Sequence, residues 1–267
     1  MEEREPSRAD ARRVAVSYIG ACYRPWQEFS GGVDAAGRVR CDASMPDETD
    51  LVATYFPDVD AAAQERLRLF TEMFKEWNAR INLVSRKDID AFEEHHLLHS
   101  LAVGRVAAFP DRARVLDVGT GGGLPGLPLA ILYPRARFFL CDSIAKKARV
   151  VGEMATALGL RNVEVVHKRA ETLESKWDFV LGRAVAALPD FLGWIAKNLR
   201  EGGSPECPNG VLYLKGTKYA EELESLGIKP FCVTELRTVV DRPYFDEKFL
   251  VHLPAGAVRR CRNLIQA

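Results

Sequence analysis

The stretch "VLDVGTGGGLPGLPLAI", from Val115 to Ile131, decides the fold of this chain. One acidic residue, Asp117, interrupts its first apolar run, and a loop with glycine at positions 119, 121, 122, 123 and 126 follows. Glycine lets a backbone bend sharply or come very close to another group. We therefore predict a buried strand that ends in a tight loop, in front of a helix, with the loop built to hold a small ligand.

Strand-like and helix-like segments alternate from this stretch onward. Segments typical of strands are 114–119, 137–142, 163–167, 177–185, 210–216, 231–240 and 247–254, and segments typical of helices are 124–134, 144–160, 188–200 and 219–227. Strands that alternate with helices of this length form a parallel sheet covered on both faces. The last two strands, joined by a turn around Pro243, are expected to form a hairpin at one edge. The predicted fold class is α/β, with a Rossmann-like sheet of seven mostly parallel strands.

The chain before residue 111 has a different character. Residues 1–50 carry many turn-forming residues and little apolar periodicity, so we expect an extension in a loop or disordered conformation. From Asp58, apolar residues recur every three or four positions, as on one face of a helix that follows an aspartate cap. A second stretch of this kind runs from Asp88 to about Val106. We predict that residues 51–110 form a small helical cap and residues 111–267 the ligand-binding domain.

The bulk composition is that of an ordinary globular protein. Of the 267 residues 47% are hydrophobic, and 37 basic residues balance 37 acidic ones. Domains that bind nucleic acid usually carry a basic excess, so the zero net charge alone counts against such a partner, although it does not exclude a local basic patch. No apolar run reaches the roughly 20 residues that cross a bilayer, and the six cysteines form no CxxC pair. We expect a cytoplasmic monomer without membrane contact; in a eukaryotic source, an organelle stroma or matrix is the alternative.

The glycine loop has three possible interpretations. A phosphate-binding P-loop is excluded, because no Lys-Ser/Thr pair follows the last glycine. A nicotinamide dinucleotide is allowed, since Gly121, Gly123 and Gly126 match GxGxxG, and Asp142 ends the next strand, where it suits the ribose of either cofactor. S-adenosylmethionine (SAM) fits better, because the Asp117 carboxylate favours a cation over a diphosphate. The terminal hairpin also fits the seven-stranded sheet of class I SAM-dependent methyltransferases better than a six-stranded dinucleotide-binding sheet.

Six segments resemble, in order, the pattern of the RsmG family, also called GidB. They are "EWNARINLVSRKDIDAFEEHHLLHSLAV", "LDVGTGGGLPGLPLAI", "FLCDSIAKKARVV", "NVEVVHKRAE", "DFVLGRAVAAL" and "GVLYLKG". Members of that family transfer a methyl group from SAM to the N7 of a guanine in the 16S ribosomal RNA of the small subunit. The resemblance runs from about Trp77 to the last strand, and its WN-x-x-IN-L and GxGLPG segments are the most specific. Residues 1–50 have no counterpart in the family.

The resemblance also implies which residues contact SAM. The implied contacts are Gly119, Leu124, Ala170, Glu171 and Arg183, and strand geometry adds Asp142. Two departures from the family pattern stand out. In "HLLHS", His99 occupies a position where an Asp is usual, and an insertion, "SPECPN", precedes the strand at 210–216. The change at His99 is expected to affect how the N-terminal helices meet the sheet or the RNA, and neither departure touches the SAM loop.

The implied chemistry needs no general base, because guanine N7 carries a lone pair and no proton. In agreement with this, no (D/N)PP(Y/F) motif follows the fourth strand. We therefore expect no catalytic acid or base, and catalysis by alignment of the reacting atoms with exclusion of water. His95, His96 and His99 have helical spacings that suit a metal, but HExxH is not formed and no third ligand is evident, so no metal is expected.

The RNA requires cations along its path. The preferred candidates are Arg183 and Lys215, which lie at the carboxyl ends of strands on the cofactor side. For all other candidates a solvated surface charge is the simpler interpretation. These are Lys146 and Arg80, followed by Arg86, Lys87, Lys147, Arg149, Lys168, Arg169, Lys218, Arg259, Arg260 and Arg262. Trp77 and Trp194 lie on apolar helix faces and are expected in the core rather than as stacking platforms.

Two other functions stay open at this point. One is a non-catalytic regulator that binds SAM or a nucleotide without an RNA surface. The other, ranked lower, is an NAD(P)-dependent oxidoreductase, which the GxGxxG spacing formally allows.

Overall fold

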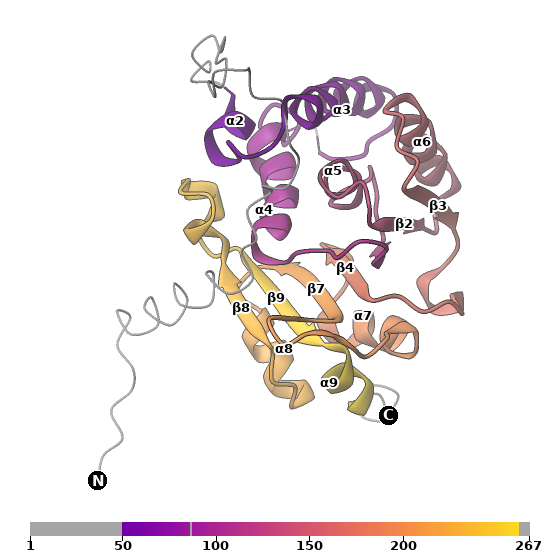
Figure 1. The fold of residues 1–267 in the computed structure, drawn as a ribbon, viewed down its shortest axis with the longest axis vertical. Coiled ribbons are helices and arrows are strands. Elements are labelled where there is room, and N and C mark those ends of the chain that lie inside the picture. The colour runs from indigo at the N-terminus through magenta and orange to yellow at the C-terminus, as the bar shows by residue number, and fades with distance from the viewer. Residues whose placement is uncertain (1–49, 86, 262–267) are drawn as a thin grey trace, which may run out of the picture.

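The computed structural model describes residues 50–85 and 87–261, and its main sheet has seven strands in the order β3-β2-β1-β4-β7-β9-β8 (Figure 1). The strands are β1 (Arg114–Val118), β2 (Arg137–Asp142), β3 (Val163–His167), β4 (Phe179–Arg183), β7 (Gly210–Lys215), β8 (Cys232–Glu235) and β9 (Phe249–Pro254). Neighbours from β3 to β7 are parallel, whereas β9 is antiparallel to both β7 and β8. The predicted fold class and the terminal hairpin are confirmed.

Helices cover both faces of this sheet (Figure 1). On one face lie α2 (Leu51–Tyr55), α3 (Ala61–Arg80), the π-helix η1 (Glu93–Leu98), α4 (His99–Val106), α5 (Gly126–Leu132) and α6 (Ala145–Ala157). On the other lie α7 (Leu188–Ile195), α8 (Tyr219–Leu226) and α9 (Ala255–Arg260), with the 3-10 turns η2 (Ala170–Thr172) and η3 (Ala196–Asn198). A separate hydrophobic cluster fills the space under each layer. Strands β1, β2, β4, β7 and β9 are buried on both faces, which is why their sequences read as nearly continuous apolar runs, whereas the edge strands β3 and β8 are partly exposed.

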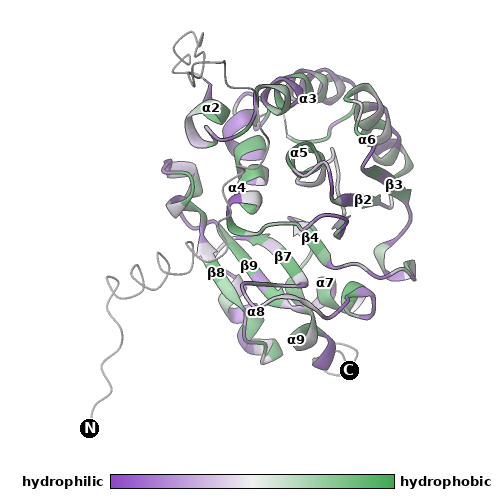
Figure 2. Ribbon diagram, in the orientation of Figure 1, coloured by the Kyte–Doolittle hydropathy of each residue, from purple (hydrophilic) through white to green (hydrophobic). Residues whose placement is uncertain are grey.

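Helix α3 shows how the N-terminal region joins the sheet. Asp60 caps its first turn by accepting a hydrogen bond from the backbone of Ala63 at 2.8 Å. Leu67, Phe70 and Phe74 lie on its inner side and are fully buried, and Figure 2 shows this division between apolar and polar faces. The predicted helix is thus confirmed.

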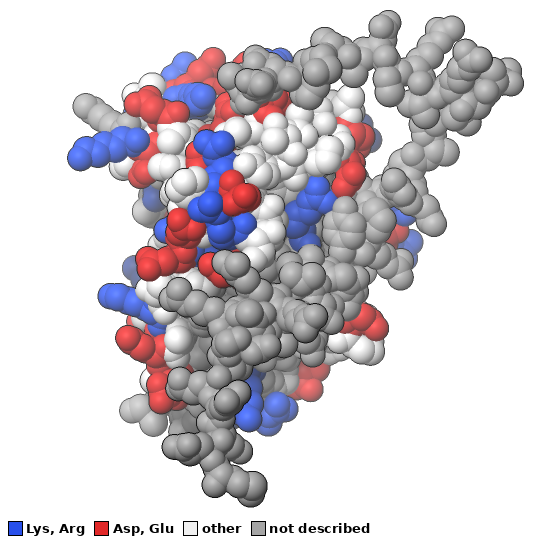
Figure 3. Space-filling view, turned by 90° about the vertical axis from the view of Figure 1, so that its left-hand side faces the viewer, with Lys and Arg blue, Asp and Glu red and all other residues white. Residues whose placement is uncertain are grey.

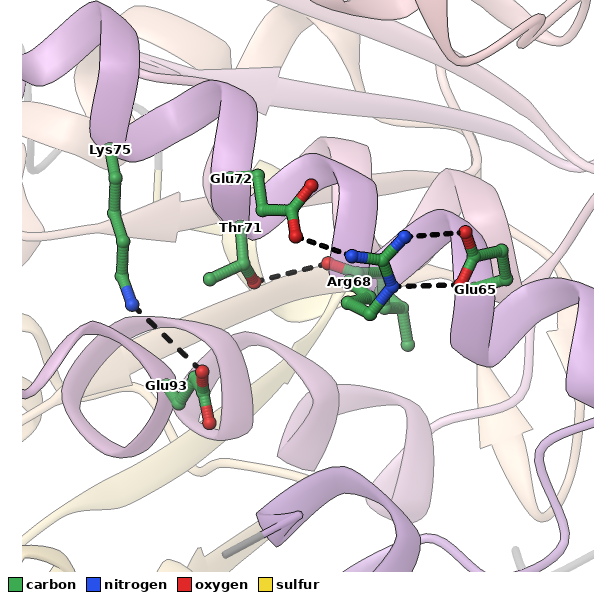
Figure 4. Close-up of polar contacts among 7 residues, drawn as sticks. Glu65, Arg68, Thr71, Glu72, Lys75 and Glu93 are labelled. Carbon is green, nitrogen blue, oxygen red and sulfur yellow. Dashed lines mark hydrogen bonds and ion pairs between the residues drawn. The ribbon is translucent and has the colours of Figure 1, made fainter.

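The outer side of α3 carries ion pairs (Figure 4). Arg68 contacts Glu65 at 2.7 Å and also Glu72, one turn further along. Lys75 approaches Glu93 of η1, with 4.0 Å between Nζ and Oε1. These side chains are about half exposed to solvent, so each pair contributes little to stability, on the order of 0–1 kcal/mol.

The second predicted helix starts later than expected and is not a plain α-helix. Residues 87–91 form turns and a bend, and the Ser85 hydroxyl just before them donates to Asp88 Oδ2 at 2.7 Å. The π-helix η1 follows and passes directly into α4. Because Ser and Asp hydrogen-bond locally in non-helical conformations, they compete with helix formation at this point. The prediction of one helix from Asp88 is therefore wrong in its first turns.

The two short helices α2 and α9 and one small hairpin were not predicted. The hairpin joins β5 (Gly203–Ser204) to β6 (Cys207–Pro208), within the inserted segment. His252 of β9 holds it in place, with 2.8 Å between its Nε2 and the Pro208 carbonyl. Burial lowers the pKa of His252 to about 4, so this imidazole is neutral near pH 7.

The helices of the predicted cap share one hydrophobic cluster with the sheet, from Val52 to Leu250. The division into a cap (51–110) and a ligand-binding domain (111–267) stays a prediction, and the predicted extension lies outside the described residues except for Asp50. Among the described helices, none combines the length and the apolarity that spanning a membrane requires.

Candidate functional site

The glycine loop begins where β1 ends. Gly119, Gly121 and Gly123 have φ angles of +64°, +60° and +89°, a region that residues with a side chain rarely adopt. A Cβ atom on Gly122 would lie 2.3 Å from Cε2 of Phe74 in α3. The predicted sharp bend is confirmed, and the close neighbour at Gly122 is helix α3 itself.

The buried side chain of Asp117 is hydrogen-bonded to two residues of this loop. Its carboxylate is 1% exposed, and Oδ2 accepts hydrogen bonds from the Thr120 hydroxyl at 2.6 Å and the Gly126 N–H at 3.0 Å. Burial raises the pKa of Asp117 to about 7, against the opposing effect of these two hydrogen bonds. The interpretation of Asp117 as a charge that faces the ligand is therefore corrected. A buried carboxyl joins the two ends of the loop instead.

Two substitutions at Asp117 distinguish how its hydrogen bonds and its protonation each contribute to the free energy of unfolding. The folded protein keeps a proton on this carboxyl up to about pH 7, whereas the unfolded chain loses it near its ordinary pKa of about 4. We expect the free energy of unfolding of the wild type to fall as pH rises from about 4 to about 7, by at most about 1.4 kcal/mol per pH unit. Asp117→Asn keeps an acceptor and should remove this slope. Asp117→Ala should remove the slope as well and, because it also loses both hydrogen bonds, should be less stable than Asp117→Asn by about 1–3 kcal/mol at every pH.

The measurement is urea unfolding of the SAM-free protein across this pH range. The wild type is compared with each variant at every pH, so that the contributions of other titrating groups cancel. A constant difference between the wild type and Asp117→Asn would contradict the expected pKa.

Asp142 ties the loop to the second strand. Its Oδ2 accepts from the Gly121 N–H at 2.9 Å, and its Oδ1 accepts from the Ile144 N–H at 2.8 Å. Ile144 itself is 50% exposed, the higher value of the two exposed large apolar residues among those described. An exposed apolar side chain beside a strand-terminal acid suits packing against a flat ring. Ile144 was not among the predicted contacts, although an apolar residue two positions after Asp142 could have indicated it.

The other predicted cofactor contacts lie at the same edge of the sheet, because β1 to β4 are parallel. Ala170 is buried in η2, directly after β3, and Glu171 is exposed, with its Oε1 3.8 Å from Nη1 of Arg169. Leu124 is buried in the first hydrophobic cluster. A Cβ on Gly119 would meet both methyl groups of Val185 at 3.0 Å, so the segment after β4 lies against the loop.

A cavity of about 350 Å³ lies beyond that segment, towards β7. Its lining residues are His95, His96, His99, Arg183, Ala184, Ala186, Tyr213, Leu214, Lys215, Gly216, Tyr244 and Lys248. The structure thus brings together Arg183 and Lys215, the two preferred RNA candidates, at the carboxyl ends of β4 and β7 as predicted. The three histidines considered as metal ligands line the same cavity, but no grouping of His, Cys, Asp and Glu in residues 50–85 and 87–261 suits a metal ion.

His96 positions the Arg183 guanidinium. Arg183 Nη2 lies 2.6 Å from His96 Nδ1, and Nη1 lies 3.5 Å from the His96 carbonyl oxygen. Because arginine only donates, Nδ1 accepts and the imidazole proton resides on Nε2. Burial and the charge of Arg183 lower the pKa of His96 to about 4. The imidazole is therefore neutral and adds no second positive charge beside Arg183, whose own pKa is lowered by burial.

His99, the departure from the family pattern, is buried behind this pair. Its ring packs edge-on against Tyr244 and Phe245, with 6.0 Å between ring centroids in each case. Burial first and the Arg183 charge second keep the pKa of His99 well below its ordinary value. Its neutral ring contributes no negative charge to the cavity, unlike the Asp that is usual there.

Lys215 and the segment after β4 complete the cavity wall. Lys215 Nζ lies 2.7 Å from Glu222 Oε2, which also accepts from the backbone of Leu188 at 3.1 Å. Ala184 has a φ of +52°, an uncommon conformation for a residue with a side chain. The Tyr213 hydroxyl contacts both the N–H and the carbonyl of Ala186, which fixes this turn.

The remaining RNA candidates lie outside the cavity. Lys146 and Arg80 are exposed, and the Arg80 guanidinium lies 5.2 Å from the centroid of the Trp77 ring. Arg86 and Arg262 fall outside the described residues. Trp77 and Trp194 are half-buried and pack against the two hydrophobic clusters, close to the expected core positions. On the face shown in Figure 3, basic and acidic side chains interleave, in keeping with the zero net charge.

Comparison with known proteins gives a family for this chain. The family model described as "GidB: rRNA small subunit methyltransferase G" matches residues 63–240. A protein named ribosomal RNA small subunit methyltransferase G from Cytophaga hutchinsonii is 41% identical over 205 residues, which cover 77% of this chain and 99% of the relative. Its namesake from Flavobacterium johnsoniae is 42% identical over 205 residues, or 77% of this chain and 97% of that protein.

Among solved structures, a SAM-dependent methyltransferase from Aquifex aeolicus matches with a TM-score of 0.47 and 18% identity, covering 62% of this chain and 93% of that one. The family match covers most of the described residues, and the relatives align over nearly their full length. The chain therefore belongs to the GidB family, the family of rRNA small subunit methyltransferase G.

Proposed function

We propose that this protein transfers a methyl group from SAM to the N7 of a guanine in small-subunit (16S) ribosomal RNA. Family membership supports the methyl transfer and the RNA substrate, and the choice of N7 follows the family resemblance. The structural observation that carries the proposal is the pairing of two features at one sheet edge. A glycine loop fixed by Asp117 and Asp142 adjoins a cavity that holds the guanidinium of Arg183.

The described residues fit SAM at the loop. Gly119 is exposed at the mouth of the loop, and a Cβ there would fill the space in front of Val185. Each carboxylate oxygen of Asp142 accepts one backbone hydrogen bond and has a lone pair left for a ribose hydroxyl. Ile144 offers an apolar surface for the adenine. We also assign Ala170, Glu171 and Arg183 to this site, and Leu124 through the backbone of the loop.

SAM supplies a methyl group on a sulfonium, and the protein has to orient the acceptor towards it. Guanine N7 needs no base, so the neutral His96 is suited to holding Arg183 rather than to taking a proton. An arginine is the usual donor to guanine O6, and holding O6 leaves N7 free for the methyl group. Alignment of this kind can supply about 7–11 kcal/mol of a reaction barrier.

The test uses the purified full-length protein, radiolabelled SAM, and small subunits from cells that lack the modification. We expect label at a single guanine, which chemical cleavage at 7-methylguanosine then maps. Label on another atom would contradict the N7 assignment. SAM binding without transfer would indicate a regulator, and NAD(P) binding without SAM binding an oxidoreductase. Naked 16S RNA serves as a parallel substrate.

We further propose that the protein acts as a monomer in the cytoplasm, where small subunits are assembled. Light scattering of the purified chain tests the monomer, and fractionation of the source cells tests the compartment.

A further inference from the structure

The cavity beside Arg183 carries an unusual charge for a half-enclosed site. Three of its lining residues are cationic, namely Arg183, Lys215 and Lys248, and among the described residues that line it none is acidic. Lys215 is neutralised by Glu222, with which it forms a close ion pair. Arg183 is held by two acceptors of His96, both of them neutral.

Lys248 is the least compensated of the three cations. Its ammonium lies 5.2 Å from the centroid of the Tyr244 ring, and within residues 50–85 and 87–261 it forms no ion pair with a carboxylate. Tyr244 is itself fixed, because His95 stacks on its ring with 3.9 Å between centroids and the Tyr244 hydroxyl donates to the His95 carbonyl at 3.1 Å. Among the described residues, neither Arg183 nor Lys248 is in ion-pair contact with a carboxylate, and Asp117 and Asp88 act on Arg183 only at longer range. This excess of positive charge at the cavity favours an anion as its occupant.

Unpartnered buried nitrogens give a second and independent indication of a ligand. His96 and His99 are 9% and 7% exposed, and Nε2 of each is buried without a hydrogen-bond partner among the described residues. In His96 this nitrogen carries the proton, because Nδ1 accepts from Arg183. Buried donors in folded proteins are nearly always paired. A ligand oxygen in the cavity would supply the missing acceptor for His96.

The position of Lys248 separates this cavity from the cofactor loop. The loop follows β1, whereas Lys248 precedes β9, and the sheet order runs β1-β4-β7-β9. Lys215, at the end of β7, pairs with Phe249, next to Lys248. Neighbouring strands lie about 4.8 Å apart, so Lys248 is roughly three strand spacings from the loop. An anion bound by Lys248 therefore lies on the side of Arg183 that faces away from the cofactor loop, where the RNA that accepts the methyl group would bind.

We propose that this cavity contains a phosphate-binding subsite for the substrate RNA, in which Lys248 holds one backbone phosphate beside the guanine that Arg183 contacts. The inference rests on the proposed function and adds a substrate contact to it. The volume of the cavity, about 350 Å³, lies at the lower end of the range of small-ligand sites, about 300–1,000 Å³. The carboxylate of SAM is the competing anion.

The test compares Lys248→Gln with the wild type in RNA binding at increasing salt. Unmethylated 16S RNA is the probe, and SAM is left out, so that the readout does not depend on methyl transfer. Each phosphate contact contributes about 0.7–0.9 to the slope of log K against log salt. We expect Lys248→Gln to flatten the slope by about this amount and to raise the Kd for RNA about tenfold. The Kd for SAM, measured by calorimetry, should not change.

Two further variants serve as controls. Lys248→Arg keeps the charge and should keep the wild-type slope. Lys229→Gln removes an exposed lysine from the segment before β8 and should leave the slope unchanged. Melting temperatures confirm that the variants fold, and if Lys248→Gln does not, Lys248→Met takes its place in the comparison.

An unchanged slope for Lys248→Gln, alongside normal RNA binding by the wild type, would overturn the subsite. So would a weakened Kd for SAM, which would assign the cavity to the carboxylate of the cofactor. A wild type that neither binds nor methylates the RNA would instead contradict the proposed function, so the two failures are distinguishable.

Discussion

Gly119→Asp is expected to raise the Kd for SAM at least about 100-fold, equivalent to about 2.7 kcal/mol. The added Cβ would press on both methyl groups of Val185 at 3.0 Å, and the φ of +64° strains any residue with a side chain. Such strain alone costs about 1–2 kcal/mol, and the carboxylate fills the mouth of the loop. Isothermal titration calorimetry with SAM measures the effect.

Gly159→Asp is the matched control for this variant. Gly159 ends α6 with a φ of +66°, and within the described chain a Cβ there would have no atom within 4 Å. The control therefore carries the same backbone strain without touching the loop. It should lose about 1–2 kcal/mol of stability and bind SAM as the wild type does. Wild-type affinity in Gly119→Asp would exclude this loop as the cofactor site.

Arg183→Met is expected to lower turnover about 100-fold at saturating SAM. The substitution removes the guanidinium that faces the cavity and leaves His96 Nδ1 without its donor at 2.6 Å. A reacting group that is misplaced by about 1 Å can cost about 10²-fold in rate. Arg183→Lys should recover little, because a lysine lacks the planar fork that contacts both acceptors of His96. Single-turnover methylation of small subunits measures the rate.

Arg200→Met is the control for a lost arginine. Arg200 is exposed and its Nη1 lies 3.6 Å from Asp178, at the opposite end of β4. This variant should retain wild-type turnover. Because Arg183 is also assigned to the SAM site, the Kd for SAM and the KM for RNA are measured separately for Arg183→Met. Turnover equal to the wild type would remove Arg183 from the site.

Much of the fold could be predicted from the sequence because most strands of the main sheet are buried on both faces. Runs such as "RFFLCD" and "GVLYLKG" are apolar throughout and are bounded by turns, and they form β2 and β7 with nearly the predicted limits. The short elements α2, α9 and the β5–β6 hairpin contain no comparable apolar run. A helix of five or six residues shows too little periodicity to be recognised, and its stability comes from tertiary packing.

The candidate site was less predictable, because its parts meet only in the folded protein. The loop glycines and Arg183 stand in recognisable motifs, and the topology of a parallel sheet predicts their common edge. Tyr244 lies in the connection between the last two predicted strands and Lys248 at the start of the second of them. Their approach to His95 and Arg183 depends on the path of that connection. Asp117 was misread for a similar reason, since neighbouring residues do not reveal whether a carboxyl faces solvent or the interior.

The position of β9 has a consequence for incomplete chains. This strand lies between β7 and β8 although it is the last of the seven to be synthesised. A chain terminated before Phe249 would leave the edge of β7 bare, with a row of unsatisfied amides and carbonyls that invites pairing with another polypeptide. Premature termination or proteolytic loss of the C-terminal segment should therefore yield aggregates rather than a smaller working enzyme. Nascent chains also cannot complete the sheet until β9 has left the exit tunnel.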